Sequence, residues 1–138
     1  MKRNIIFLSL VAVLVVTMSL AYGGVKGSMS ISIPFEFYVQ DQLMPAGEYR
    51  FEIGSVAMSP VVAVRTSEGE GIRFLLTRLE ANTISNPSYL RFNQYDEKRF
   101  LSSVSIGDSK ARVSMSKLER ELQIAKKVSQ TETLIAQK

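Results

Sequence analysis

The side chains that carry most nucleophilic and metal chemistry are missing from this chain. Its 138 residues include no histidine and no cysteine. Serine–histidine–aspartate and cysteine–histidine catalytic systems are therefore impossible, and a zinc site would lack its usual nitrogen and sulfur ligands. The sequence also has no glycine-rich phosphate loop and no calcium loop of the EF-hand type. We expect no catalytic residue, no metal site and no cofactor.

One short string matches a catalytic pattern. Ser114-Met115-Ser116-Lys117 fits S-x-x-K, in which a lysine activates a serine. Enzymes that use this pattern carry companion motifs resembling S-D-N and K-T-G, and neither motif is present. Ser116 also stands three residues before Glu119, which is the spacing of a helix capping box. We therefore interpret the string as the start of a helix.

Paired carboxylates are the remaining route to catalysis, because two of them can hydrolyse a glycosidic bond. Glu48 and Glu52 fall on one face of a predicted strand. Arg50 lies between them on the same face and offsets part of their negative charge. Outward-facing glutamates on a strand ordinarily keep a surface soluble. We expect the protein not to be an enzyme, and a small hydrolase of envelope glycans is the alternative.

The strand predicted over residues 89–95 is a better candidate for recognition. Leu90 and Phe92 are expected to point into the core. The alternate residues then form a candidate ligand face toward water: Tyr89, Arg91, Asn93 and Tyr95. Tyrosines that flank a guanidinium and an amide can stack on sugar rings and hydrogen-bond their edges. Ordinary cross-strand pairing explains the same residue types, so both interpretations stay open.

Residues 1–21 are predicted to be a secretory signal peptide. Met1-Lys2-Arg3-Asn4 is a basic head, and residues 5–16 are apolar except for Ser9. A cut after Ala21 places small residues at the −3 and −1 positions, while a cut after Gly23 and an uncleaved anchor are alternatives. The predicted location is periplasmic or extracellular, with membrane contact only through an uncleaved signal segment.

The charge of the exported chain is nearly balanced. The full chain has 17 basic and 13 acidic residues and a net charge of +4. Lys2 and Arg3 leave with the signal peptide, so the exported chain has a net charge of about +2. Such a charge gives no reason to expect a nucleic-acid partner. The expected partner is an unknown envelope protein or glycan.

Alternation of apolar residues indicates strands. Over residues 31–39 the inward positions are Ile31, Ile33, Phe35, Phe37 and Val39. Residues 40–47 are predicted to turn, with Gly47 able to take a positive φ. Further strands are predicted over residues 48–53, 61–65, 72–78, 89–95 and 98–106.

Six to seven such strands predict a mostly β domain, either a small antiparallel β-sandwich or an open barrel, with a C-terminal α-helix. An open barrel also allows a carrier of an apolar ligand. That function requires an internal cavity lined by residues such as Phe35, Phe37, Phe51 and Phe92.

The repeat changes to a helical period near residue 116. An apolar stripe predicts a helix over about residues 117–128 that frays toward Ala136: Leu118, Leu122, Ala125 and Val128. This stripe should dock on the sheet, and a coiled-coil seam with a second copy is the alternative. The predicted layout is a signal peptide (1–21), a flexible leader (22–28), a β-domain (29–115) and a helix with its tail (116–138).

Three stretches resemble a family of small secreted bacterial proteins of unassigned function. They are "IPFEFYVQDQLMPAGEYRFE" (33–52), "LRFNQYDEKRFLSSV" (90–104) and "SKLERELQIAK" (116–126). Members of the family show a phrase close to PF-x-F-x-V…L-P-A-G-x-Y. The resemblance supplies no catalytic or binding residue. Two positions depart from the family pattern, because Asp96 replaces an expected glycine and Ser105 replaces an expected aromatic residue.

These observations together predict an exported, non-catalytic structural or binding β-domain of the cell envelope. Its ligand is not specified by the sequence.

Overall fold

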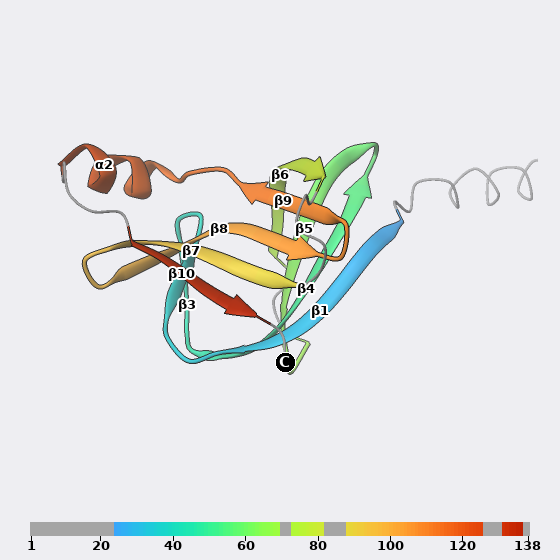
Figure 1. The fold of residues 1–138 in the computed structure, drawn as a ribbon, viewed down its shortest axis with the longest axis horizontal. Helices are drawn as coiled ribbons and strands as arrows, with labels where there is room; N and C mark the ends of the chain where they lie inside the picture. Colours follow the sequence, from blue (N-terminus) through green and yellow to red (C-terminus); the bar gives the residue numbers. More distant parts are fainter. Residues whose placement is uncertain (1–23, 70–72, 82–87, 126–130, 137–138) are drawn as a thin grey trace, which may run out of the picture.

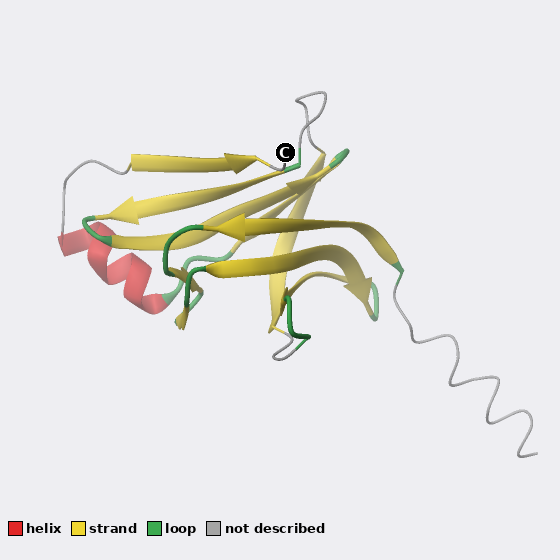
Figure 2. Ribbon diagram, turned by 90° about the horizontal axis from the view of Figure 1, so that it is seen from below, coloured by secondary structure: helices red, strands yellow, loops and turns green. Residues whose placement is uncertain are grey.

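The computed structural model describes residues 24–69, 73–81, 88–125 and 131–136. Within these ranges ten strands form two sheets that do not close into a barrel, and one helix lies near the C-terminal end. Figures 1 and 2 show the two layers of strands and the helix at one end of the molecule. The fold class predicted from the sequence, a small β-sandwich with a C-terminal helix, is confirmed.

The elements follow one another along the chain as β1 (Val25–Ile33), β2 (Phe37–Val39), β3 (Gln42–Met44), β4 (Gly47–Val56), β5 (Ser59–Thr66), β6 (Arg73–Ala81), β7 (Tyr89–Tyr95), β8 (Lys98–Ile106), β9 (Ser109–Val113), α2 (Lys117–Ala125) and β10 (Thr131–Ala136). No helix of the described ranges is both long enough and apolar enough to span a membrane.

Strand β6 links the two sheets. Its first half pairs with β5 and belongs to the sheet β1-β4-β5-β6, whereas its second half pairs with β9. The second sheet continues from β9 to β8, and β7 joins β8 to the edge strand β10. All pairs are antiparallel except the single Tyr38–Phe100 pair, through which β2 lies parallel to β8.

The structure has more strands than the six to seven predicted. β1 begins at Val25, and Val25, Gly27 and Ser28 are paired with β4, so residues 25–28 belong to a strand rather than to a flexible leader. The strand predicted over residues 31–39 is interrupted at Pro34, which has no backbone N–H to donate. Strands β3, β9 and β10 were not predicted, and β10 occupies part of the segment expected to be a helical tail.

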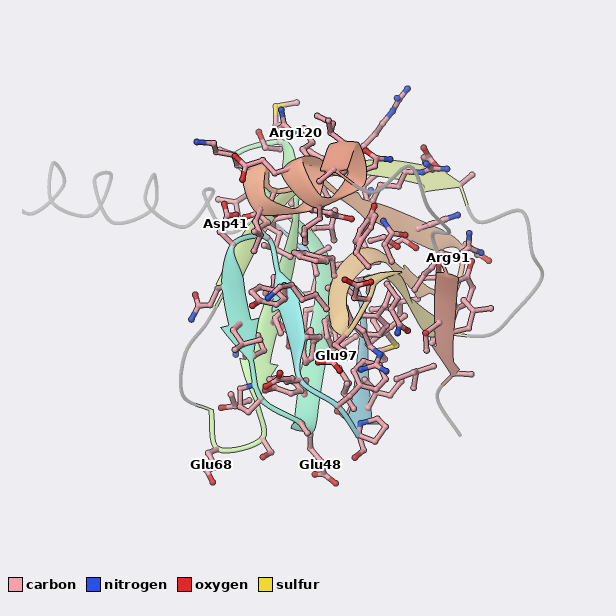
Figure 3. All side chains as sticks on the ribbon, turned by 90° about the vertical axis from the view of Figure 1, so that its left-hand side faces the viewer. Asp41, Glu48, Glu68, Arg91, Glu97 and Arg120 are labelled. Atoms are coloured by element: carbon pink, nitrogen blue, oxygen red, sulfur yellow. The ribbon has the colours of Figure 1, made fainter. Side chains whose placement is uncertain are left out.

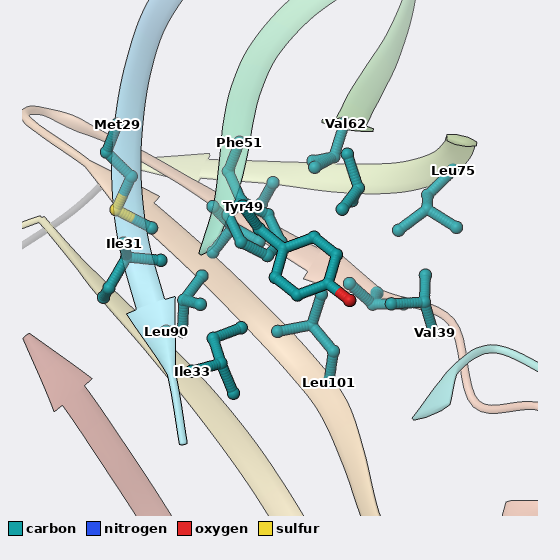
Figure 4. Close-up of a cluster of buried hydrophobic side chains, with 14 of the residues drawn as sticks. Met29, Ile31, Ile33, Val39, Tyr49, Phe51, Val62, Leu75, Leu90 and Leu101 are labelled. Carbon is teal, nitrogen blue, oxygen red and sulfur yellow. The ribbon is translucent and has the colours of Figure 1, made fainter. Parts of the chain in front are cut away.

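The core lies between the sheets and contains the predicted inward positions of β1, β2 and β4. Phe51 and Ile53 of β4 are fully buried and belong to the same cluster as Leu90 and Leu101 of the second sheet. Phe51 and these two leucines are labelled in Figure 4. Phe35 is only half-buried, because it lies in the link between β1 and β2. Gly27 allows β1 to cross close to β8, since a Cβ at this position would lie 2.8 Å from Ile106 Cγ2.

Aromatic rings fill the centre of this core. The ring centroids of Phe37 and Phe92 lie 5.5 Å apart, those of Phe35 and Phe92 5.3 Å apart, and those of Phe37 and Tyr49 5.2 Å apart, all edge to face. Such contacts are the preferred geometry of aromatic pairs. These rings pack against one another rather than lining the cavity that an apolar carrier requires.

A tyrosine fixes the corner between β3 and β4. The buried Tyr49 hydroxyl donates a hydrogen bond of 2.6 Å to the Pro45 carbonyl, four residues upstream. Burial raises the pKa of this hydroxyl. Gly47 does not adopt the positive φ expected of it, since among the described glycines only Gly69 and Gly107 do so. The phrase M-P-A-G-E-Y therefore specifies a proline corner closed by a tyrosine.

The turn between β4 and β5 is strained. Val56 pairs with Ser59, and both residues between them have positive φ, 47° for Ala57 and 66° for Met58. This is the two-residue turn that favours Asn-Gly, because other L-residues pay a steric cost there. Met58 is also 98% exposed, so no packing of its side chain offsets that cost.

Replacing Ala57-Met58 by Asn-Gly is therefore expected to raise the free energy of unfolding by about 1–2 kcal/mol. Urea denaturation followed by circular dichroism measures the change. Met58→Ala is the matched control, because it removes the exposed side chain and keeps the positive φ. An equal gain from the control would show that strain is not the cause.

Candidate functional site

Helix α2 docks on the sheet through a polar residue. Glu119 is buried, whereas Leu118 and Leu122 are half-buried and Ala125 is exposed. The predicted apolar stripe is thus only part of the contact, and its last member, Val128, lies outside the described residues. The predicted helix cap is present, because the Glu119 backbone N–H donates to Ser116 Oγ at 3.0 Å.

The Glu119 carboxyl ties the helix to β7. Asn93 Nδ2 donates a hydrogen bond of 2.9 Å to Glu119 Oε1. The carboxyl also interacts with the Tyr95 hydroxyl and with the Ser116 backbone. Burial raises the pKa of Glu119 and outweighs these polar contacts, which act in the opposite direction. Burial and the nearby Glu119 carboxyl together raise the pKa of Tyr95.

The four residues of the candidate ligand face do share one side of β7, and Leu90 and Phe92 are buried in the core as predicted. The expectation that the four face water is wrong for Tyr89, Asn93 and Tyr95, which are buried. Asn93 and Tyr95 are covered because α2 lies over them, and Tyr95 also packs edge to face with Phe100 at 5.9 Å.

Past Asn93, the outer face of the second sheet is hollowed. Arg91 of β7 pairs with Ser103 of β8, which pairs with Arg112 of β9, so a small residue lies between two long cationic ones. In the next row Ser105 of β8 lies between Tyr89 of β7 and Lys110 of β9. Because adjacent strands are about 4.8 Å apart, these rows form a trough with a serine floor and taller walls.

A β-bulge in β8 places these serines on the outer face. The register shifts between Arg91, which pairs with Ser103, and Phe92, which pairs with Leu101, so Ser102 is the extra residue. Ser102 Oγ donates a hydrogen bond of 3.0 Å to the Arg91 carbonyl and fixes the bulge. As a result Leu101 and Val104 both point into the core, while Ser103 points outward.

The trough contains a hollow of about 240 Å³, which we call the basic hollow. Its main lining residues are Arg91, Asn93, Ser103, Lys110, Arg112 and Met115. None of the described residues that line it is acidic. Arg112 Nε is paired with Glu80 Oε2 at 3.0 Å, whereas Lys110 makes no ion pair with a described residue. The lining is therefore cationic.

Two hydroxyls on the trough floor lack hydrogen-bond partners in the described protein. Ser103 is 3% exposed and Ser105 is 0% exposed, and neither Oγ bonds to another residue. Buried polar side chains are ordinarily satisfied, and each exception calls for an explanation. Ser103 lines the basic hollow directly, so its hydroxyl is placed to donate to a bound group.

A second hollow on the other sheet has a different character. It encloses about 370 Å³ beside Tyr49 and includes Arg50 and Arg65. Both arginines are paired with the same carboxyl, because Glu52 lies 3.0 Å from Arg50 Nε and 3.5 Å from Arg65 Nη2. With the Glu48 carboxyl, which lines the same hollow, the charges of Arg50, Arg65 and Glu52 sum to zero, so this hollow is a poorer site for a charged ligand.

The carboxylates do not form a glycosidase-like pair in either hollow. Among the residues that the structure describes, Glu48 is the one acidic residue that lines the second hollow, and no acidic residue lines the basic hollow. Glu48 and Glu68 also project at an end of the molecule far from Arg91 (Figure 3). No group of three or more acidic side chains in the described ranges is arranged to hold a metal ion.

No family model, curated protein or solved structure matches this chain. The resemblance to the family of small secreted bacterial proteins therefore stays a prediction. What can be said about function comes from the chemistry of the basic hollow.

Two of the four residues of the predicted ligand face belong to this hollow. Arg91 and Asn93 were in the candidate ligand face and line the basic hollow, whereas Tyr89 and Tyr95 do not line it. Ser103, Lys110 and Arg112 were missed. The alternation of Lys110, Ala111 and Arg112 was a signal for β9, with only Ala111 and Val113 as inward residues.

Proposed function

We propose that this protein is an exported, non-catalytic binding domain of the cell envelope, and that the basic hollow is its ligand site. The proposal depends on one observation: the hollow combines a cationic lining with the buried Ser103 hydroxyl, which has no hydrogen-bond partner among the described residues. A surface that served only solubility would have no need of a hydroxyl that is buried without a partner.

The hollow is also built on rigid elements. Its walls belong to three paired strands, and its end is held by the Asn93–Glu119 hydrogen bond to α2. A preformed site loses little conformational entropy when a ligand binds, which favours recognition. The cationic side chains among its described lining residues support binding of a negatively charged or polar envelope component.

Binding to isolated cell-envelope polysaccharide tests the proposal. The purified exported protein, which should begin at Tyr22, is expected to co-sediment with the polysaccharide. The double variant Lys110→Ala/Arg112→Ala should bind roughly ten-fold or more weakly, because hydrogen bonds to charged groups contribute about 1.5–3 kcal/mol each.

The double variant Arg50→Ala/Arg65→Ala is the matched control, since it removes the same charge from the other sheet. It should bind nearly as well as the unmodified protein. Equal losses in the two double variants would indicate unspecific attraction, and the role of the basic hollow would then be rejected.

A further inference from the structure

We propose that the basic hollow binds a phosphate monoester group. This inference rests on the proposed binding function and specifies its ligand class. Arg91 and Arg112 lie on either side of Ser103. Lys110 lies two residues from Arg112 on β9, opposite Ser105. An anion seated over Ser103 would therefore meet cationic side chains from two strands.

The number of donors favours phosphate over carboxylate. A phosphate monoester has three terminal oxygens and a charge of about −1.5 to −2 at neutral pH, whereas a carboxylate has two oxygens in one plane. Arg91, Ser103 and Arg112 approach from three adjacent strands, so three oxygens can each find a donor. Arginine is also well suited to phosphate, because its planar fork donates two parallel hydrogen bonds.

The floor of the trough supplies neutral donors. The Ser103 and Ser105 hydroxyls are buried without partners, and a phosphate oxygen would accept a hydrogen bond from Ser103. Ser105 has a small side chain, which keeps the floor low beside Tyr89 and Lys110. The unmet hydrogen-bonding capacity of Ser103 thus has an explanation in a bound anion.

The size of the hollow limits how much of the ligand enters. Sites for drug-sized molecules typically measure about 300–1,000 Å³, and this hollow measures about 240 Å³. It has room for a phosphoryl group and the adjoining part of its carrier. The carrier is either a phosphorylated sugar or the headgroup of a phosphate-bearing lipid, and both present the same anion.

Titration calorimetry with the purified exported protein tests the proposal. Glucose 1-phosphate at low salt is expected to give saturable binding, and glucuronate, a carboxylate of similar size, should bind at least several-fold more weakly. Ser103→Ala should weaken glucose 1-phosphate binding roughly ten-fold, because it removes a hydrogen bond to a charged group. The melting temperature of Ser103→Ala should not fall, because the hydroxyl has no partner in the protein.

Vesicles of phosphatidylcholine with phosphatidic acid distinguish the two sources. Binding to these vesicles that is lost in Ser103→Ala identifies a lipid headgroup, and binding to glucose 1-phosphate alone identifies a soluble sugar phosphate. The proposal is overturned if glucose 1-phosphate does not bind, if glucuronate binds equally well, or if Ser103→Ala binds normally.

The two proposals can fail separately. If the protein binds envelope polysaccharide and glucose 1-phosphate does not compete, the envelope function stands and the phosphate assignment is wrong. If glucose 1-phosphate binds and the polysaccharide does not, the phosphate site stands and the envelope function is wrong.

Discussion

Replacing Phe92 with alanine is expected to lower the free energy of unfolding by about 4 kcal/mol. Phe92 is 0% exposed and forms edge-to-face contacts with both Phe35 and Phe37. Its removal would therefore leave a cavity where the two sheets meet and would also abolish two aromatic pairs. Because domains of this size are stable by only about 5–15 kcal/mol, the variant should unfold at a much lower urea concentration.

Phe35→Ala is the matched control for this experiment. The Phe35 ring touches Phe92 but is only half-buried, and it also lies under the Arg99 guanidinium at 4.4 Å. Its loss should cost clearly less than the loss of Phe92. Similar costs for the two variants would contradict the placement of Phe92 at the centre of the core.

The inward residues were predictable because period-two alternation runs through residues 31–39 and 49–53, although the structure divides the first stretch between β1 and β2. Phe37 and Val39 of β2, and Phe51 and Ile53 of β4, are all buried. The phrase that resembles the secreted family has a structural explanation, since the Tyr49 ring packs on Phe37 while its hydroxyl bonds to the Pro45 carbonyl. This phrase therefore specifies a core contact and a chain corner.

One departure from the family pattern also has a physical account. Asp96, which stands where a glycine is expected, has a φ of 53° in the turn between β7 and β8. Glycine adopts this left-handed conformation without steric cost, and aspartate tolerates it better than most residues. The turn therefore keeps its shape with either residue.

The unpredicted strands depend on partners that are distant in sequence. β10 is defined by its pairing with β7, for example Leu134 with Arg91. Its local signal is only the brief alternation of β-branched Thr131, Thr133 and Ile135. β9 has only five residues, so its alternation is brief. Lys110 and Arg112 become neighbours of Arg91 only after β9, β8 and β7 pair, and the bulge at Ser102 is needed to turn Ser103 outward.

A buried acid was the least predictable part of the site. The helical repeat indicated that leucines would dock α2, whereas the residue with the least exposure on the helix is Glu119. Glu119 occupies the third position after the Ser116 cap and also accepts the hydrogen bond from Asn93, a lining residue of the basic hollow. The packing of the helix and the shape of the hollow are therefore linked through one carboxyl.

Replacing Glu119 with alanine is expected to lower the free energy of unfolding by about 2 kcal/mol, because the buried Asn93 amide would lose its acceptor. Glu119→Gln retains an acceptor oxygen and removes the charge, so it should have a different, pH-dependent effect. Burial raises the pKa of Glu119 in the folded protein above its unfolded value of about 4.3. Between these two values the folded state holds a proton that the unfolded state has released.

The stability contributed by this proton is therefore present at low pH and is lost as the pH rises through the folded pKa. Glu119→Gln cannot titrate, so its stability relative to the unmodified protein should increase across that interval and stay constant above it. Urea denaturation at a series of pH values, from about pH 4 to about pH 8, measures both variants. The Tyr95 hydroxyl ionises above this range, since its ordinary pKa of about 10 is raised further by burial. A stability difference between Glu119→Gln and the unmodified protein that does not change with pH would show that Glu119 is not buried as a carboxyl against β7.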